Sequence, residues 1–195
     1  MYKSTYIFAA LVGVLLLRGA ATATTYYVAT NGSDSWPGTS SQPWATIQYA
    51  VDTISDGDTI IVKSGTYVGC RIENSGSSSA PKTLKSETQY GAVLNNKSSR
   101  AKHNGILEVE LYDNTISYWV IDGFEVDGVS KTYRCIDARV TDHITVKNCK
   151  THDAYMTGIM TAFCDNILVE NNVSYSNGEH GQLSRFRTRT ARRAA

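Results

Sequence analysis

The chain has 195 residues and a formal net charge of +1, and 42% of its residues are hydrophobic. This length fits one domain with a sizeable core, and beyond the N-terminal segment no stretch is apolar enough to enter a membrane. Between Thr24 and Gly181 there are 18 acidic and 12 basic residues, a charge of −6, whereas five of the ten arginines lie after Gly181. That basic end could bind a polyanion, but the export signal described next argues against nucleic acid as a partner.

Residues 1–23 are predicted to be a secretion signal. Lys3 gives a positive start, Ile7–Leu17 is an apolar core too short to span a bilayer comfortably, and Ala21–Ala23 is a small-residue cleavage site. The mature chain is therefore expected to begin at Thr24, to be secreted, and to have no membrane contact after cleavage. The alternative is an uncleaved anchor.

A strand, a loop and a helix are predicted to follow the signal. Thr25–Ala29 is rich in β-forming residues and is followed by turn residues. Within Trp44–Ile54, apolar residues recur at the i, i+3, i+4 and i+7 spacing of one buried helix face. Asp56–Asp58 ends this helix, and Thr59–Lys63 is the next expected strand.

Beyond residue 67 the chain consists of short β-rich segments between polar turns. The expected strands are Thr83–Lys85, Ala92–Leu94, Ile106–Leu111, Ser117–Ile121, Phe124–Val126, Ile144–Val146 and Ile167–Val169.

The C-terminal half repeats itself at a fixed spacing. Asp142–Asn148 matches Asp165–Asn171 position for position at an offset of 23, and Gly158 falls on Gly181. Trp119–Phe124 can be placed on Ile144–Cys149 at an offset of 25. A period of roughly 20 to 50 residues indicates stacked structural units.

Two repeat architectures have such a period. A leucine-rich repeat needs L-x-x-L-x-L spacing, which the sequence lacks. A right-handed parallel β-helix needs short β-branched strands, about three per coil, separated by turns with Asn, Asp and Gly. We therefore predict an all-β fold, a right-handed parallel β-helix with about 23–25 residues per coil, whose short N-terminal helix caps the open edge of the first coil.

The expected organisation is a signal peptide over residues 1–23, a β-helix domain over 24–181 and a basic tail over 182–195. Within the domain, the N-terminal cap covers about 24–67 and the coils about 68–181. By the register of the repeat a new strand should begin near Gln182, but Gln182–Ala195 has no Gly, Asn or Asp for a turn and is rich in arginine. We interpret this tail as out-of-frame translation of GC-rich DNA or as disordered, with a natural basic tail as the alternative. The chain would then be an incomplete and inactive fragment of a longer protein.

Four cysteines in an exported chain could form two disulfides. Cys149 and Cys164 lie within one repeat and could bridge across it. The alternative is that all of them are buried thiols that act as small apolar residues.

A series of N-terminal motifs carries a family resemblance. In order, the motifs are Tyr26–Asp34, Pro37–Thr39, Gln42–Val51, Gly57–Val62 and Gly65–Tyr67. The series resembles the N-terminal block of secreted right-handed parallel β-helix proteins of the pectate-lyase-like superfamily. That resemblance implies an extracellular protein, expected to be monomeric, that acts on or binds polysaccharide, frequently a uronate polymer such as pectate or alginate.

The resemblance also implies a chemistry. In lyases of this superfamily a basic side chain abstracts the proton beside the uronate carboxylate, and calcium or a cationic residue neutralises that carboxylate. Hydrolases on the same fold use paired carboxylates instead. Calcium is therefore the implied cofactor, and polysaccharide lyase the implied enzyme class.

One candidate metal site follows from the repeat. Asp142 and Asp165 stand one coil apart at equivalent positions, and a calcium ion held between them with help from Asp137 would relieve their repulsion. The alternative is that both side chains simply form turn hydrogen bonds before a strand.

The candidate catalytic residues follow two adjacent strands. His152 and Asp153 lie in one coil, and Glu179 and His180 lie in the next, close to tyrosines that could stack on sugars. Successive coils could bring His152 and Glu179 together as acid and base partners. The alternative is a polar loop on the solvent side.

Three functions remain open at this point. The chain could derive from an extracellular polysaccharide lyase, from a non-catalytic glycan-binding or adhesin module, or from a structural repeat protein without a ligand.

Overall fold

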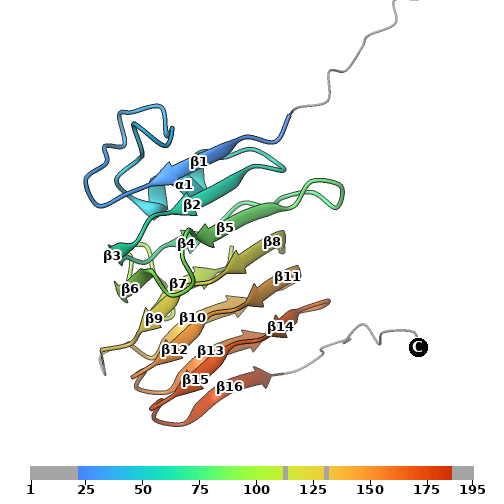
Figure 1. Ribbon diagram of the computed structural model, residues 1–195. Coiled ribbons are helices and arrows are strands. Elements are labelled where there is room, and N and C mark those ends of the chain that lie inside the picture. Colours follow the sequence, from blue (N-terminus) through green and yellow to red (C-terminus); the bar gives the residue numbers. More distant parts are fainter. Residues whose placement is uncertain (1–21, 112–113, 130–131, 186–195) are drawn as a thin grey trace, which may run out of the picture.

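Three parallel sheets wrap around one core and form a β-helix (Figure 1). The computed structural model describes residues 22–111, 114–129 and 132–185. Most of the expected signal peptide and residues 186–195 of the expected tail lie outside this part. The predicted all-β class and right-handed parallel β-helix are confirmed.

Each coil contributes one strand to sheet A, one to sheet B and one to sheet C, in that order. Sheet A contains β1 (Thr25–Val28), β2 (Thr59–Val62), β5 (Lys82–Ser86), β8 (Ile116–Asp122), β11 (Thr141–Lys147) and β14 (Leu168–Glu170). Sheet B contains β3 (Gly65–Val68), β6 (Ala92–Asn96), β9 (Glu125–Asp127), β12 (Lys150–His152) and β15 (Val173–Tyr175). Sheet C contains β4 (Arg71–Ile72), β7 (Gly105–Val109), β10 (Arg134–Arg139), β13 (Thr157–Ala162) and β16 (His180–Arg185).

The strand pairing follows the offsets found in the sequence. Val146 pairs with Val169 at an offset of 23 and with Ile121 at an offset of 25. Leu84 and Ile60 continue the same row toward the N-terminus. This apolar row runs along the inside of sheet A, and its members from Ile60 to Val146 are fully buried. Burying such a row removes apolar surface from water. This stabilises the fold by about 25 cal/mol for each Å² buried and is the main stabilising term.

The single described α-helix, α1 (Ile47–Thr53), lies at the β1 end of the stack, as predicted for a cap (Figure 1). It begins later than the expected Trp44, because Asp34 accepts hydrogen bonds from the backbone of Ala45 and Thr46 and holds this entry extended. Thr46 is the N-cap, and its hydroxyl accepts from the backbone N–H of Tyr49. Within the described residues no helix is long and apolar enough to cross a membrane.

The corners between strands use left-handed backbone conformations. At the A-to-B corner, Asn148 and Asn171 have φ angles of 53° and 54°, a region that asparagine tolerates better than most residues. The amide of Asn148 donates to Asp122 at 2.7 Å. Stacked corners therefore keep their shape from coil to coil.

Two strands, β3 and β16, cross the boundaries that the sequence predicted for the N-terminal cap and for the basic tail. The first complete coil already begins at β2, so the expected cap boundary at residue 67 falls inside β3. The strand that the register predicts near Gln182 does form. It is β16, which continues to Arg185 and pairs in register with β13. Backbone hydrogen bonds to β13 do not depend on side-chain type, which is why an atypical sequence can still form this strand.

The four cysteines are free and buried, so the thiol alternative holds. Burial raises the pKa of Cys135 and of Cys149 to about 12. Such thiols stay protonated and unreactive in the folded chain.

We predict that the four thiols react slowly in the native protein and rapidly in urea, because folding excludes both water and reagent from them. Ellman's reagent should measure four thiols per chain only after unfolding. Rapid reaction in native buffer would contradict the buried placement.

We also predict that Val146→Ala lowers the free energy of unfolding by roughly 2–3 kcal/mol, since it leaves a cavity in the apolar row. Val120→Ala on the outer side of β8 is the matched control and should cost less than about 1 kcal/mol. Urea unfolding measures both, and equal losses would contradict the assigned faces.

Candidate functional site

A row of charged and aromatic side chains covers the outer face of sheet B. In register, Glu125 lies beside Lys150, and Asp127 lies beside His152, which in turn lies beside Tyr175. The residues between them, Val126 and Thr151, are fully buried on the inner face. The alternation of a β-strand therefore places the five polar or aromatic side chains together on the outside.

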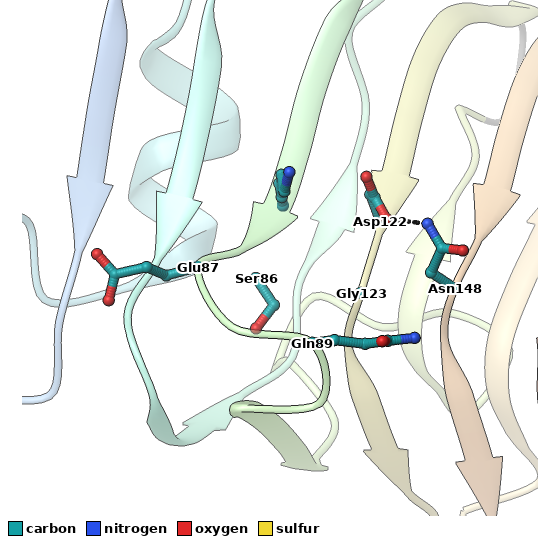
Figure 2. Close-up of a pocket in the computed structure, with 7 residues that line it drawn as sticks. Ser86, Glu87, Gln89, Asp122, Gly123 and Asn148 are labelled. Atoms are coloured by element: carbon teal, nitrogen blue, oxygen red, sulfur yellow. Dashed lines mark hydrogen bonds between the residues drawn. The ribbon is translucent and has the colours of Figure 1, made fainter.

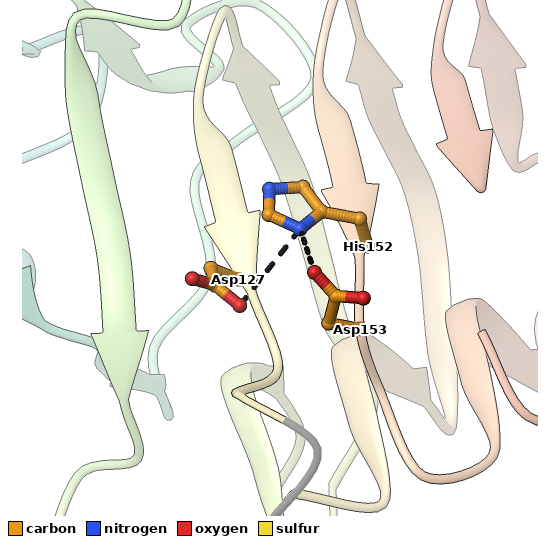
Figure 3. A group of neighbouring side chains, drawn as sticks. All are labelled: Asp127, His152 and Asp153. Carbon is orange, nitrogen blue, oxygen red and sulfur yellow. Dashed lines mark hydrogen bonds and ion pairs between the residues drawn. The ribbon is translucent and has the colours of Figure 1, made fainter. Parts of the chain in front are cut away.

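His152 lies in the middle of this row, and its ring faces Asp127 and Asp153 (Figure 3). Its Nδ1 lies 2.7 Å from Oδ2 of Asp153 and 3.8 Å from Oδ1 of Asp127, and its Nε2 lies 3.0 Å from Oε1 of Glu125. The ring of Tyr175 stacks on the imidazole with centroids 5.0 Å apart and planes 10° from parallel. The imidazole is therefore held on both edges and on one face.

Charge pairing shifts the titration of this group. Partial burial opposes the charged form of His152, but the hydrogen bonds that the protonated ring donates to Asp153 and Glu125 outweigh it and raise its pKa. For Glu125, burial acts to raise the pKa, but the contacts with Lys150 and His152 lower it by more, so its pKa lies below the ordinary value. Lys150 binds Glu125 with its Nζ 2.5 Å from Oε2, and this hydrogen bond raises the pKa of Lys150. Protonated His152 and Lys150 are poor general bases, because a base must accept a proton.

Glu179 and His180 do not join His152. Both are exposed at the B-to-C corner, where their backbone N–H groups donate to the carbonyl of Met156. The proposed pairing of His152 with Glu179 is replaced by pairing with Glu125, because Tyr175, rather than Glu179, lies beside His152 on the next coil.

The candidate calcium ligands are also separated. Asp137 is buried on sheet C, with Oδ1 2.9 Å from Nε of Arg139 and Oδ2 3.4 Å from Nη1 of Arg134. Burial raises the pKa of Asp137 despite these arginines. Asp142 and Asp165 do lie side by side, but Oδ1 of Asp142 already accepts a hydrogen bond from Asn166. The expected three-carboxylate cage does not form, and calcium binding to the Asp142–Asp165 pair stays a prediction.

A hollow of about 310 Å³ lies at the B-to-C corner and is lined by cations and an aromatic ring. Its lining residues are Lys102, His103, Asn104, Tyr133, Arg134 and Met156. Tyr133 is 43% exposed and meets the 64% exposed Tyr155 of the next coil edge to face, with centroids 5.6 Å apart. Tyr155 lines a second hollow, of about 410 Å³, together with Glu179.

The loop that carries Lys102 and His103 is held in place by a buried carboxylate. Oε1 of Glu108 accepts from the backbone N–H groups of His103 and Gly105, and its Oε2 accepts from that of Lys102. Glu108 is 1% exposed, so these bonds satisfy a charge that would otherwise be costly to bury. The loop therefore presents Lys102 and His103 at a defined place.

A third hollow, of about 320 Å³, lies at the A-to-B corner between Lys85, Glu87, Gln89 and Asp122 (Figure 2). Asp122 is held there by Asn148, and Lys147 is 3.9 Å from its other carboxylate oxygen. The hollow combines Lys85 with Glu87 and Asp122, so its charges are mixed and it carries no clear ligand preference.

The sequence pattern predicted His152 and Asp153 as site residues, but it did not predict Glu125, Asp127 or the hollow at the B-to-C corner. The repeat offset of 25 could have revealed both acidic residues, since it places Asp127 beside His152 and Glu125 beside Lys150. The hollow combines segments from three loops, which no single motif could reveal.

We predict that the pKa of His152 lies above the ordinary value of about 6.5 and that Glu125→Gln lowers it. The stabilisation of the fold by protonated His152 is then fully present below the pKa that His152 has in the unfolded chain. It is lost as pH rises through the raised pKa of His152 in the folded chain. NMR titration of the imidazole measures this, with Asp122→Asn as a control that should change nothing. An unchanged pKa in Glu125→Gln would contradict the assigned contact.

Comparisons with known proteins agree with the β-helix fold. Residues 26–185 match the family described as "Pel9A-like, right handed beta helix region". A pectate lyase PEL9 of Emericella nidulans is 39% identical over 97 residues, which cover 48% of this chain and 22% of that protein. The chain thus spans about a fifth of the curated relative it matches.

Solved structures show the same fold. The crystal structure of pectate lyase Pel9A has a TM-score of 0.59 at 23% identity, covering 82% of this chain and 41% of that chain. An alginate lyase from Paenibacillus sp. str. FPU-7 has a TM-score of 0.55 at 22% identity, covering 76% of this chain and 44% of that chain. The match over residues 26–185, the parallel three-sheet coil and the N-terminal cap together show that the chain belongs to the Pel9A-like right-handed β-helix family.

Proposed function

We propose that this chain binds and acts on acidic, uronate-containing polysaccharide outside the cell. The observation that carries the proposal is the hollow that Lys102, His103 and Arg134 line together with the exposed ring of Tyr133. The names of the pectate lyase and alginate lyase relatives support the same substrate class. The apolar N-terminal segment with its small-residue cleavage site supports the extracellular location.

Charge makes this hollow distinctive. The body of the chain between Thr24 and Gly181 carries a charge of −6, so it repels a polyuronate over most of its surface. A local cluster of cations is therefore needed for binding, and guanidinium groups suit carboxylates because they offer paired donors. Arg134 lines the hollow while its Nη1 pairs with Asp137 and donates to the carbonyl of His103, and Lys102 is exposed.

The tyrosines supply the second element of sugar recognition. Tyr133 and Tyr155 expose aromatic faces on successive coils, and neighbouring strands lie about 4.8 Å apart. An extended sugar chain lying along the helix axis would meet one ring after the other. Apolar rings combined with a few placed polar groups are typical of ligand sites.

A non-catalytic glycan-binding module is the second candidate function, and the ion pairs on sheet B favour it. Elimination requires a base beside the substrate, but contacts with carboxylates raise the pKa of Lys150 and of His152, so a larger share of each side chain carries its proton at a given pH. Binding to the hollow does not require a base. The two functions therefore differ in product formation and not in affinity.

We predict that Lys102→Ala weakens binding to polygalacturonate oligosaccharides about two- to fivefold, the effect expected for one exposed charge contact. Lys85→Ala removes another exposed lysine, from sheet A, and should leave affinity unchanged. Tyr155→Ala should also weaken binding, and added salt should weaken it for the wild type. Titration calorimetry measures these affinities, and equal effects of the two lysine variants would contradict the assigned hollow.

The same samples distinguish the two functions. Incubation with pectate, alginate or glycosaminoglycans should raise ultraviolet absorbance if unsaturated products form by elimination. Binding without such an increase identifies the non-catalytic module, and no binding to any of these polymers overturns the proposal.

A further inference from the structure

The side chains around Nδ1 of His152 have the composition of a metal site. Oxygen atoms of Asp127 and Asp153 and Nδ1 of His152 all lie within 4.8 Å of one another, the only such group among the described residues. The measured separations from Nδ1, 2.7 Å and 3.8 Å, bracket the spacing of about 3.4 Å between ligands that are each about 2.1 Å from a tetrahedral metal. Small side-chain adjustments would bring all three atoms to one ion (Figure 3).

The opposite edge of the imidazole is already arranged for this role. Nε2 lies 3.0 Å from Oε1 of Glu125, so a neutral ring that donates there leaves its Nδ1 lone pair directed at the two aspartates. Metal-binding histidines commonly donate their second nitrogen to a carboxylate, which fixes the tautomer and the ring orientation. Lys150 holds Glu125 from its other oxygen, and Tyr175 holds the ring plane.

The two aspartates are also positioned by the backbone. Oδ1 of Asp127 accepts from the backbone N–H of Val129 at 2.8 Å, at the end of β9. Asp153 follows β12 directly and has a φ of 55°, which turns the chain and keeps its carboxylate beside the ring. The three ligands thus come from two hydrogen-bonded coils, and their spacing is set by the register of β9 and β12.

We propose that Asp127, His152 and Asp153 bind one divalent cation of the zinc or manganese type. A set of two carboxylates and one imidazole suits these ions, whereas calcium prefers six to eight oxygen ligands. Binding replaces the proton on Nδ1 of His152 with the metal, so one proton leaves for each ion bound by the protonated form. Asp127 and Asp153 are partly exposed, which leaves room for water or a sugar oxygen on the ion.

This proposal does not depend on the polysaccharide proposal, because its test uses metal chlorides alone. Titration calorimetry of the whole chain with ZnCl₂, MnCl₂ and CaCl₂ should show one zinc or manganese site and weaker calcium binding. Asp127→Asn should reduce zinc affinity roughly 10- to 100-fold, and Glu125→Gln should reduce it through the ring orientation. Asp122→Asn is the matched control in sheet A and should leave zinc affinity unchanged.

Manganese gives a local readout that does not depend on variants. It should broaden the imidazole NMR signals of His152 far more than those of the exposed His143, which lies near the start of β11 in sheet A. The proposal is overturned if zinc and manganese do not bind, if calcium binds as tightly as zinc, or if Asp127→Asn and Asp122→Asn have equal effects. Broadening of His143 rather than His152 would overturn it as well.

Discussion

The stacking of coils in register is the constraint on which the rest of the structure depends. Backbone hydrogen bonds between neighbouring coils place each residue directly beside its equivalent, 23 or 25 positions away in the best-matched coils. Apolar rows such as Leu84–Ile121–Val146 can then run through the core without interruption. The same constraint requires corners of equal shape, and φ angles of 49° at Val140 and 57° at Phe163 show that it holds even unfavourable residues in the left-handed region.

Register also determines the electrostatics of the outer faces. Lys85, Asp122, Lys147 and Glu170 form a row of alternating charge across sheet A, in which neighbours attract. On sheet B the row from Glu125 to Lys150 is likewise attractive. Asp142 with Asp165, and Glu108 with Asp137 in sheet C, depart from this pattern, since two like charges lie side by side in each pair. The row around His152 also departs from simple alternation of charge, because Asp127, His152 and Tyr175 follow one another there. Function is best sought at such departures.

The two proposed sites share one corner of the coil. Asp153 ends the row on sheet B, and Tyr155 follows shortly after it, in edge-to-face contact with Tyr133 of the cationic hollow. A cation on Asp127, His152 and Asp153 would thus lie on the same side of the β-helix as the tyrosines. An acidic sugar chain could meet a metal and the cations of the hollow along one path, which would offset the negative charge of the body of the chain.

The sequence by itself determined the repeat, the β-helix, the cap and most strands of sheet A, because their inner and outer residues alternate clearly. It missed several strands of sheets B and C: β12 has only three residues, and β13 is buried along its whole length, so neither shows a readable period. It also identified His152 and Asp153 but not their partners. Only the tertiary structure decided that Glu125 and Asp127 face His152, that Asp137 is taken by two arginines, and that Tyr133 and Lys102 line one hollow. The physical reason is that strand periodicity is local, whereas these contacts join side chains from different coils, whose positions the stacking register and the loop conformations set together.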